Sequence, residues 1–133
     1  MSTHATGTFD IGSWDELSSE EEIGATLSRV RLTKTFQGDL AGTSVTDITT
    51  VATSAGPAAY VGIERFEGSL HGRKGAFVLQ HSAGSEDGTP GTAWLRWVIV
   101  PTSGTGELSG VRGEGQIVND DGAHSYTLDY EIG

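Results

Sequence analysis

The stretch YVGIERFEGSLHGRKGAFVLQH, Tyr60 to His81, decides the fold. Each half alternates its side chains with a period of two, which is the period of a β-strand, and a glycine-containing turn joins the halves. The residues that share one face are Tyr60, Gly62, Glu64 and Phe66 in the first half and Phe77, Leu79 and His81 in the second. Both faces are largely apolar. The pattern predicts two antiparallel strands with one face filling an interior and the other face covered as well.

The same pattern recurs on both sides of this hairpin. Further strands are expected over Thr6 to Trp14, Leu27 to Gln37, Leu40 to Thr53, Thr92 to Val100, Ser103 to Val118 and His124 to Ile132. The five glycines within Ser103 to Val118 favour a bulged or sharply bent strand there. About eight antiparallel strands at regular spacing indicate a sandwich or a closed barrel, and closure is favoured because it removes exposed strand edges. We therefore expect an all-β chain forming a single eight-stranded antiparallel β-barrel over residues 1–133.

Three segments are predicted to lie outside the strands. The acidic run DELSSEEE, Asp15 to Glu22, should form a solvated loop or one irregular turn, because its charges repel one another. Gly56-Pro57 should break the chain before the strand that begins at Tyr60. The segment SAGSEDGTPG, Ser82 to Gly91, is expected to be the most mobile loop.

Composition narrows the class of protein. The chain has 133 residues, the size of one domain, and its formal net charge of −10 would repel nucleic acid and anionic lipid surfaces. There is no cysteine, no apolar run of the roughly 20 residues needed to cross a bilayer, and no leader at Met1, so a cytoplasmic protein is expected. The histidines form no ligand motif and no Gly-x-Ser-x-Gly elbow occurs, so neither a metal nor a cofactor is expected.

Three segments resemble one known family along nearly the whole chain. They are GTFDIGSWDE from Gly7, the central hairpin, and VPTSGTGELSGVRGEGQI from Val100 followed by HSYTLDYEI. Together they resemble the small bacterial proteins grouped as the domain of unknown function DUF3224. The resemblance implies a barrel like that of allene oxide cyclase, related in shape to the dirigent and lipocalin barrels, whose better known members guide the cyclisation or isomerisation of an apolar molecule. The chain departs from the family where two tryptophans flank Arg96 and where Thr102 replaces the glycine that commonly follows the proline.

Two polar residues on the interior faces are candidate catalytic residues. Glu64 lies between Gly62 and Phe66, and apolar walls disfavour the ionised form of a carboxyl group, a property of a general acid or base. An ion pair is the commoner state of a buried carboxylate, and its partner would be Arg29, Arg31, Arg73 or Arg96. His81 shares its face with Phe77 and Leu79 and could move protons, although a hydrogen-bonded core or rim histidine is more common.

Six further residues are expected to form the walls of a substrate site: Tyr60, Phe66, Phe77, Leu79, Trp97 and Tyr126. An eight-stranded barrel is just wide enough to be filled by side chains or to hold one small ligand. Three functions follow from this. The chain could be a cofactor-independent cyclase or isomerase acting on an apolar substrate, a non-catalytic lipocalin-like binder of a hydrophobic metabolite, or a structural barrel with a filled core. Apolar outward residues such as Val78, Trp94 and Val98 favour a homodimer or homotrimer.

Overall fold

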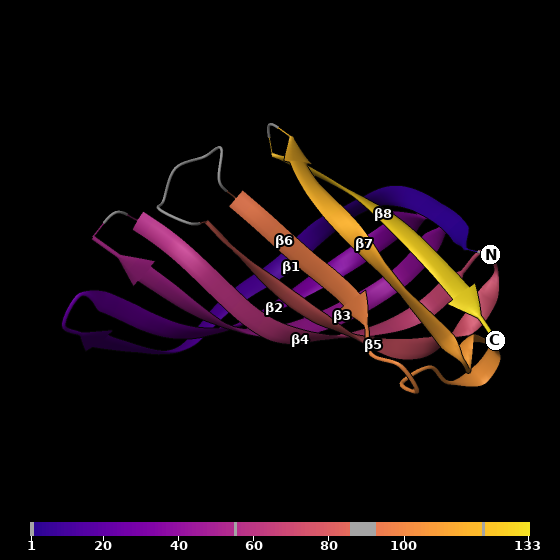
Figure 1. The fold of residues 1–133 in the computed structure, drawn as a ribbon, viewed down its shortest axis with the longest axis horizontal. Helices are drawn as coiled ribbons and strands as arrows, with labels where there is room; N and C mark the ends of the chain where they lie inside the picture. The colour runs from indigo at the N-terminus through magenta and orange to yellow at the C-terminus, as the bar shows by residue number, and fades with distance from the viewer. Residues whose placement is uncertain (1, 55, 86–92, 121) are drawn as a thin grey trace.

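A computed structural model describes residues 2–54, 56–85, 93–120 and 122–133 (Figure 1). It shows a closed barrel of eight antiparallel strands in which each strand pairs with its neighbours in the sequence. The strands are β1 (Thr3–Glu22), β2 (Ala25–Gly38), β3 (Leu40–Thr53), β4 (Gly56–Leu70), β5 (Arg73–Ser85), β6 (Ala93–Ile99), β7 (Val111–Asp120) and β8 (Ala123–Ile132). A 3₁₀ turn, η2 (Gly106–Leu108), precedes β7.

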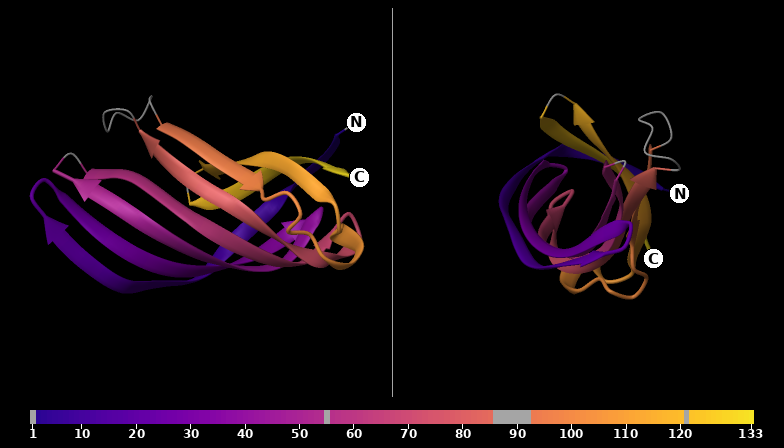
Figure 2. Two further views of the ribbon diagram at one scale, coloured as in Figure 1. Left: turned by 60° about the horizontal axis from the view of Figure 1, so that its bottom comes forward. Right: turned by 90° about the vertical axis from the view of Figure 1, so that its left-hand side faces the viewer.

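The barrel closes between its first and last strands. β1 pairs with β8 from Thr3–Tyr130 to Phe9–His124, and the end-on view in Figure 2 shows the strands arranged around a central space. The predicted fold class, a single eight-stranded antiparallel barrel, is confirmed. No helix in the described ranges is long and apolar enough to cross a membrane.

Alternation along the strands fills one end of the barrel with a packed core. Figure 1 shows both chain termini at one end of the barrel. At this end, buried aromatic and aliphatic side chains from all eight strands form the core. Phe36 lies at the centre of the aromatic contacts, with its ring 5.7 Å from Phe66, 6.2 Å from Trp97 and 5.6 Å from Tyr126 between centroids. Gly115 pairs with Trp97 across β6 and β7, and a Cβ at this glycine would lie 2.9 Å from the indole ring. A side chain there would therefore displace the largest residue of the core.

The side chain of Leu108 and a hydrogen bond made by Tyr126 complete the packed end. Leu108 in η2 is fully buried among the core residues. The Tyr126 hydroxyl accepts a hydrogen bond from the Leu40 backbone N–H at 2.8 Å and lies 3.0 Å from the Leu40 carbonyl, so it fixes the β2–β3 turn to β8.

The prediction of a loop over the acidic run was wrong. Asp15 to Glu22 belongs to β1 and pairs with β2 as far as the Glu22–Ala25 position, with irregularities between Ile11 and Ser13 and between Glu16 and Ser18. Asp15 lies opposite Arg31, but Glu16 and Glu20 to Glu22 lie opposite uncharged residues, so backbone pairing with β2 holds the run in an extended conformation despite its charge. The long β1–β2 hairpin consequently extends the barrel wall at the end away from the termini (Figure 1).

The start of the strand predicted over Ser103 to Val118 also differs. Ser103 to Gly110 is loop and 3₁₀ turn, and the strand begins at Val111. Thr102, Gly106 and Gly110 have φ values of 71°, 62° and 84°, a left-handed conformation that strand residues do not adopt and that threonine adopts only with strain. Glycine would adopt the φ value of Thr102 without this strain.

The remaining differences concern segment ends and the outer face. β4 begins at Gly56, and Pro57 pairs with Ala52 beside a register irregularity rather than breaking the chain. Ser82 to Ser85 belong to β5, and the rest of the predicted mobile loop lies outside the described residues. The outer face of the central hairpin is not covered within this chain, because Val61 is 62% and Ile63 is 44% exposed.

Candidate functional site

Glu64 lies at the centre of a buried polar cluster. It projects inward from β4 with no solvent exposure. Its carboxylate accepts hydrogen bonds from Ser44 Oγ at 2.6 Å, Trp97 Nε1 at 3.1 Å and Lys34 Nζ at 3.2 Å. The cluster thus joins side chains from β2, β3, β4 and β6. A buried carboxylate requires such partners, since an unpaired charge in an apolar interior is strongly unfavourable.

Lys34 supplies the positive charge of the cluster. The side chain is 3% exposed, and its ammonium group also lies 4.9 Å from the centroid of the Phe9 ring, over its face. The prediction that Glu64 forms an ion pair is confirmed, but the expected partners were wrong. Arg29, Arg31, Arg73 and Arg96 are all exposed on the outside of the barrel.

His81 connects this cluster to Tyr60. Its Nε2 is 2.9 Å from the Tyr60 hydroxyl oxygen, and its Nδ1 is 3.7 Å from Glu64 Oε1, beyond hydrogen-bond distance. Among the described residues, His81 Nδ1 and Thr46 Oγ1 are the buried side-chain atoms that have no hydrogen-bond partner. Tyr60, His81 and Glu64 therefore form a line of polar groups leading from the cluster toward the open end.

Burial changes the protonation of the two groups at the end of this line. Loss of solvation lowers the pKa of His81 from 6.5 to about 4, with the Lys34 charge acting in the same direction and Glu64 opposing it. Loss of solvation, together with the Glu64 charge, raises the pKa of Tyr60 to about 12. At neutral pH the imidazole is uncharged and the phenol keeps its proton.

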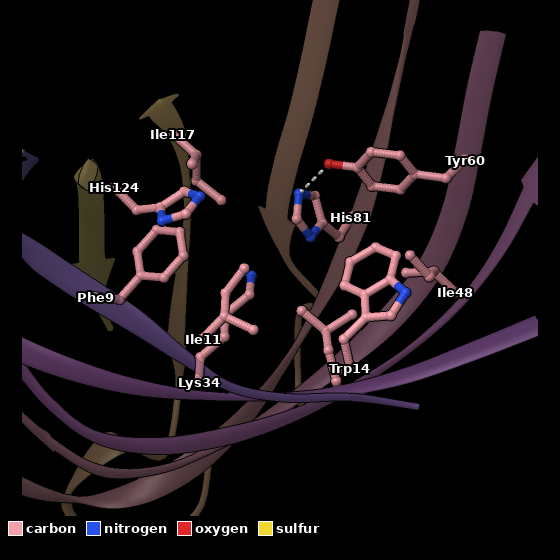
Figure 3. Close-up of a pocket in the computed structure, with 10 residues that line it drawn as sticks. Phe9, Ile11, Trp14, Lys34, Ile48, Tyr60, His81, Ile117 and His124 are labelled. Atoms are coloured by element: carbon pink, nitrogen blue, oxygen red, sulfur yellow. Dashed lines mark hydrogen bonds between the residues drawn. The ribbon is translucent and has the colours of Figure 1, made fainter. Parts of the chain in front are cut away.

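A largely apolar cavity of about 130 Å³ lies next to these residues, at the end of the barrel away from the termini. Figure 3 shows Tyr60 and His81 on one side of it and Phe9, His124 and Ile117 on the other. The residues that line it are Phe9, Ile11, Trp14, Leu32, Lys34, Ile48, Tyr60, His81, Ile117 and His124. Other hollows in the described surface, such as the one over Val98 and Arg112, lie on the outside of the barrel.

The predicted site residues divide into three groups. Tyr60 and His81 line the cavity. Glu64 is not among the lining residues and lies behind His81. The others belong to the packed core and do not line the cavity: Phe66, Phe77, Leu79, Trp97 and Tyr126. Trp97 nevertheless contacts the cluster through its indole N–H, whereas Tyr126 directs its hydroxyl to the backbone of Gln37 and Leu40.

Sequence reasoning missed the lining residues from the first two strands. Lys34 lies two residues from both Leu32 and Phe36 in β2, so the two-residue period places all three side chains inward. This signal was present in the sequence. Ile11 lies two residues after Phe9, so the two-residue period places both on one face, and this signal too was present in the sequence. Trp14 lies beyond the irregularity between Ile11 and Ser13, which changes the face that the following residues present. His124 is stacked on Phe9 with 4.9 Å between ring centroids, a contact made only by the closure of β1 onto β8.

Histidine and carboxylate groups do not gather elsewhere into a metal site. Within the described ranges, no three His, Cys, Asp or Glu side chains are placed so that they could hold a metal ion. At the cavity, Tyr60 and His81 can form hydrogen bonds and transfer protons, with Glu64 and Lys34 beside them.

Fold and site together define a small all-β barrel that is packed at one end and hollow at the other. Comparison with known proteins agrees with this class. The family described as "Protein of unknown function (DUF3224)" matches residues 5–130. A crystal structure of a protein with unknown function from the DUF3224 family, from Shewanella oneidensis MR-1, is 33% identical, with a TM-score of 0.84 over 100% of this chain and 99% of that one. None of the curated proteins matches the chain. The chain belongs to the DUF3224 family.

Replacing Lys34 with methionine should destabilise the barrel by about 3–5 kcal/mol, because the Glu64 carboxylate would remain buried without its counter-charge. Urea unfolding at pH 7 measures the change. The matched control is Arg31→Met, which removes an ion pair with Asp47 whose side chains are 51% and 37% exposed, and which should change the free energy of unfolding little. Equal losses in the two variants would contradict the role assigned to the buried pair.

His81 should make the stability pH-dependent between pH 6.5 and 4. In this range the unfolded chain binds a proton at this residue and the folded chain does not, so stability is lost as pH falls, by about 3 kcal/mol in total for a pKa of about 4. Above pH 6.5 both states are neutral and the contribution is constant. Urea unfolding of the native chain and of His81→Gln from pH 7 to pH 4.5 should show that the variant loses less stability. Parallel losses, or an NMR titration of His81 near 6.5, would rule this out.

Proposed function

We propose that the chain binds a small apolar molecule in the cavity at the open end of the barrel. The observation that carries the proposal is the division of the interior. One end is filled by close-packed aromatic side chains, while the other keeps a cavity into which Tyr60 and His81 project. Mostly apolar walls with a few placed polar groups are typical of ligand sites.

The cavity volume limits the size of the buried part of the ligand. At about 130 Å³ the cavity is below the usual range of drug-sized sites. It is close to the roughly 150 Å³ of an engineered apolar cavity that binds benzene. A molecule buried there would therefore present about one six-membered ring. Larger parts would lie at the mouth, where Ile11 and Trp14 are 39% and 57% exposed and offer further apolar contact.

A second candidate function is a cofactor-independent isomerase or cyclase that uses the same cavity. The observation that favours it is the arrangement of His81, a neutral imidazole hydrogen-bonded to Tyr60 and 3.7 Å from a carboxylate oxygen. A neutral imidazole can accept a proton, and the nearby carboxylate would stabilise the imidazolium that forms. Exclusion of water and orientation of the substrate by the walls would provide the rest of the catalysis.

The homodimer or homotrimer remains a prediction, as does a purely structural role. The oligomer is supported by apolar residues on the outer surface: Val61, Trp94 and Val118 are 62%, 47% and 53% exposed. The cavity is not explained by assembly alone, because a barrel with only a structural role needs no hollow end. We therefore rank ligand binding first.

Filling the cavity should abolish binding of an apolar probe. Toluene should bind the native chain with a dissociation constant on the order of 1 mM, and its amide chemical-shift changes should be confined to the residues around the cavity. Ile117→Trp places a larger side chain on the cavity wall and should reduce toluene affinity at least about tenfold.

Val118→Trp is the matched control. It lies next to Ile117 on β7, is 53% exposed and faces outward, so the same substitution should leave toluene affinity unchanged. If toluene does not bind the native chain, or binds both variants equally well, the proposed function is wrong.

The catalytic candidate predicts proton exchange on a bound ketone. In D₂O the native chain should accelerate the exchange of the α-protons of cyclohexanone, and His81→Gln should lower that rate at least about a hundredfold, the usual contribution of general base catalysis. Proton NMR measures the exchange. Equal exchange rates for the two proteins would contradict the catalytic candidate and leave ligand binding as the proposed function.

A further inference from the structure

We propose that the occupant of the cavity is a neutral, ring-sized molecule bearing a hydroxyl group that donates a hydrogen bond to the Tyr60 oxygen. This inference rests on the proposed function and adds the chemical class of the ligand. It depends on two properties of the cavity: the absence of net charge at its polar wall, and the direction of the hydrogen bond between Tyr60 and His81.

Charge is balanced on the polar wall of the cavity. The ammonium group of Lys34 is 3.2 Å from Glu64, so the one lysine among the lining residues already has a counter-ion. His81 is neutral at pH 7 because burial lowers its pKa to about 4. A ligand carboxylate would lose its hydration without gaining an opposite charge, which is strongly unfavourable. The wall therefore favours a neutral ligand.

The position of Glu64 sets the tautomer of His81. The carboxylate oxygen is 3.7 Å from Nδ1, and Nδ1 has no hydrogen-bond partner among the described residues. A negative charge at this distance attracts a proton to the nearer ring nitrogen, so the neutral imidazole carries its proton on Nδ1. Nε2 is then a bare acceptor.

The tautomer fixes the direction of the next hydrogen bond. With Nε2 as acceptor, the 2.9 Å contact is a bond in which the Tyr60 hydroxyl donates to His81. The phenol keeps the proton that this bond requires, because burial and Glu64 raise its pKa to about 12. Tyr60 has then used its only proton, and its oxygen offers only lone pairs to the cavity. A ligand hydroxyl can donate to that oxygen, whereas a carbonyl cannot.

Figure 3 shows how the side chains around the Tyr60 hydroxyl are arranged. Tyr60 directs its hydroxyl toward His81 and the interior, with His124 and Ile117 on the facing side. The residues opposite the tyrosine are thus an imidazole and an aliphatic side chain, and the space between the two sides is part of the cavity. A ring placed against Phe9 and Ile117 would bring a hydroxyl substituent to the Tyr60 oxygen.

Four probes of one size test the inference: toluene, benzyl alcohol, benzaldehyde and benzoate. Their affinities are measured by NMR titration at pH 8, where an ordinary imidazole is neutral. In Tyr60→Phe the affinity for benzyl alcohol relative to toluene should fall about five- to tenfold, the effect of one hydrogen bond. The ratio of benzaldehyde to toluene should not change, and benzoate should bind more weakly than toluene to both proteins.

Tyr130→Phe is the matched control. It removes a phenol hydroxyl at the packed end, where Tyr130 bonds to His71, and should leave all four affinities unchanged. If Tyr60→Phe reduces benzyl alcohol and benzaldehyde equally, or neither, while toluene still binds in the cavity, the inference is wrong and the proposed function stands. If no probe binds the native chain, the proposed function fails and the inference with it.

A second measurement needs no variant. The nitrogen chemical shifts of His81 in the native chain distinguish the two neutral tautomers. The inference requires the proton on Nδ1. A proton on Nε2 would free the Tyr60 hydroxyl to donate, and it would overturn the choice of a hydroxyl ligand whatever the affinities show.

Discussion

The burial of one carboxylate constrains the interior of this barrel. Glu64 has no access to solvent, so its charge must be balanced by groups that other strands bring into the lumen. Lys34, Ser44 and Trp97 do so from three strands, and His81 lies beside them. Satisfying the carboxylate therefore fixes where β2, β3 and β6 stand relative to β4. Burial lowers the pKa of His81, with the Lys34 charge acting in the same direction, and burial together with the Glu64 charge raises the pKa of Tyr60, so both groups of the polar wall are neutral at pH 7.

The cluster also marks the boundary between two kinds of interior. Toward the termini, Trp97 lies over Gly115 and contacts Phe36, and the core is closed by Leu108. In the other direction the fully enclosed side chains are the smaller Val30, Leu32 and Ile48, the aromatic Trp14 and Tyr60 are only partly covered, and the barrel keeps its cavity. An eight-stranded barrel can be either filled or hollow, and this one is both, because the large residues are concentrated on one side of the polar layer.

The period-two pattern was sufficient to predict the antiparallel strands, since inward positions such as Phe66 and Leu79 alternate with outward ones in nearly every strand. The choice of a closed barrel over a sandwich also needed the argument against exposed edges and the family resemblance. The prediction from sequence failed where pairing with a distant strand outweighs the preference of the segment itself. The acidic run repels itself, yet its strand is held by pairing with β2, and the long-range pairing is not visible in the run alone. The candidate site was predicted in part. Tyr60, Glu64 and His81 follow from parity, but the level along the barrel axis at which the core ends depends on strand tilt and register, and no local pattern encodes these. Hence five core residues were taken for cavity walls.

Backbone pairing, like side-chain packing, is less complete at the cavity end of the barrel than at the packed end. β1 to β5 pair along most of their lengths, whereas in the described part of the chain β6 and β7 pair at two positions, Trp97–Gly115 and Val98–Glu114. Beyond these two positions, the part of β7 that carries the cavity-lining residue Ile117 pairs with β8 alone. Backbone that is paired on one side only opens at lower free energy than a fully paired core. Ile11 and Trp14 on β1 lie beyond the β1–β8 pairing and are likewise paired on one side, with β2. The cavity walls that carry Ile11, Trp14 and Ile117 are therefore less firmly held than the polar wall carrying Tyr60 and His81, whose strands pair on both sides.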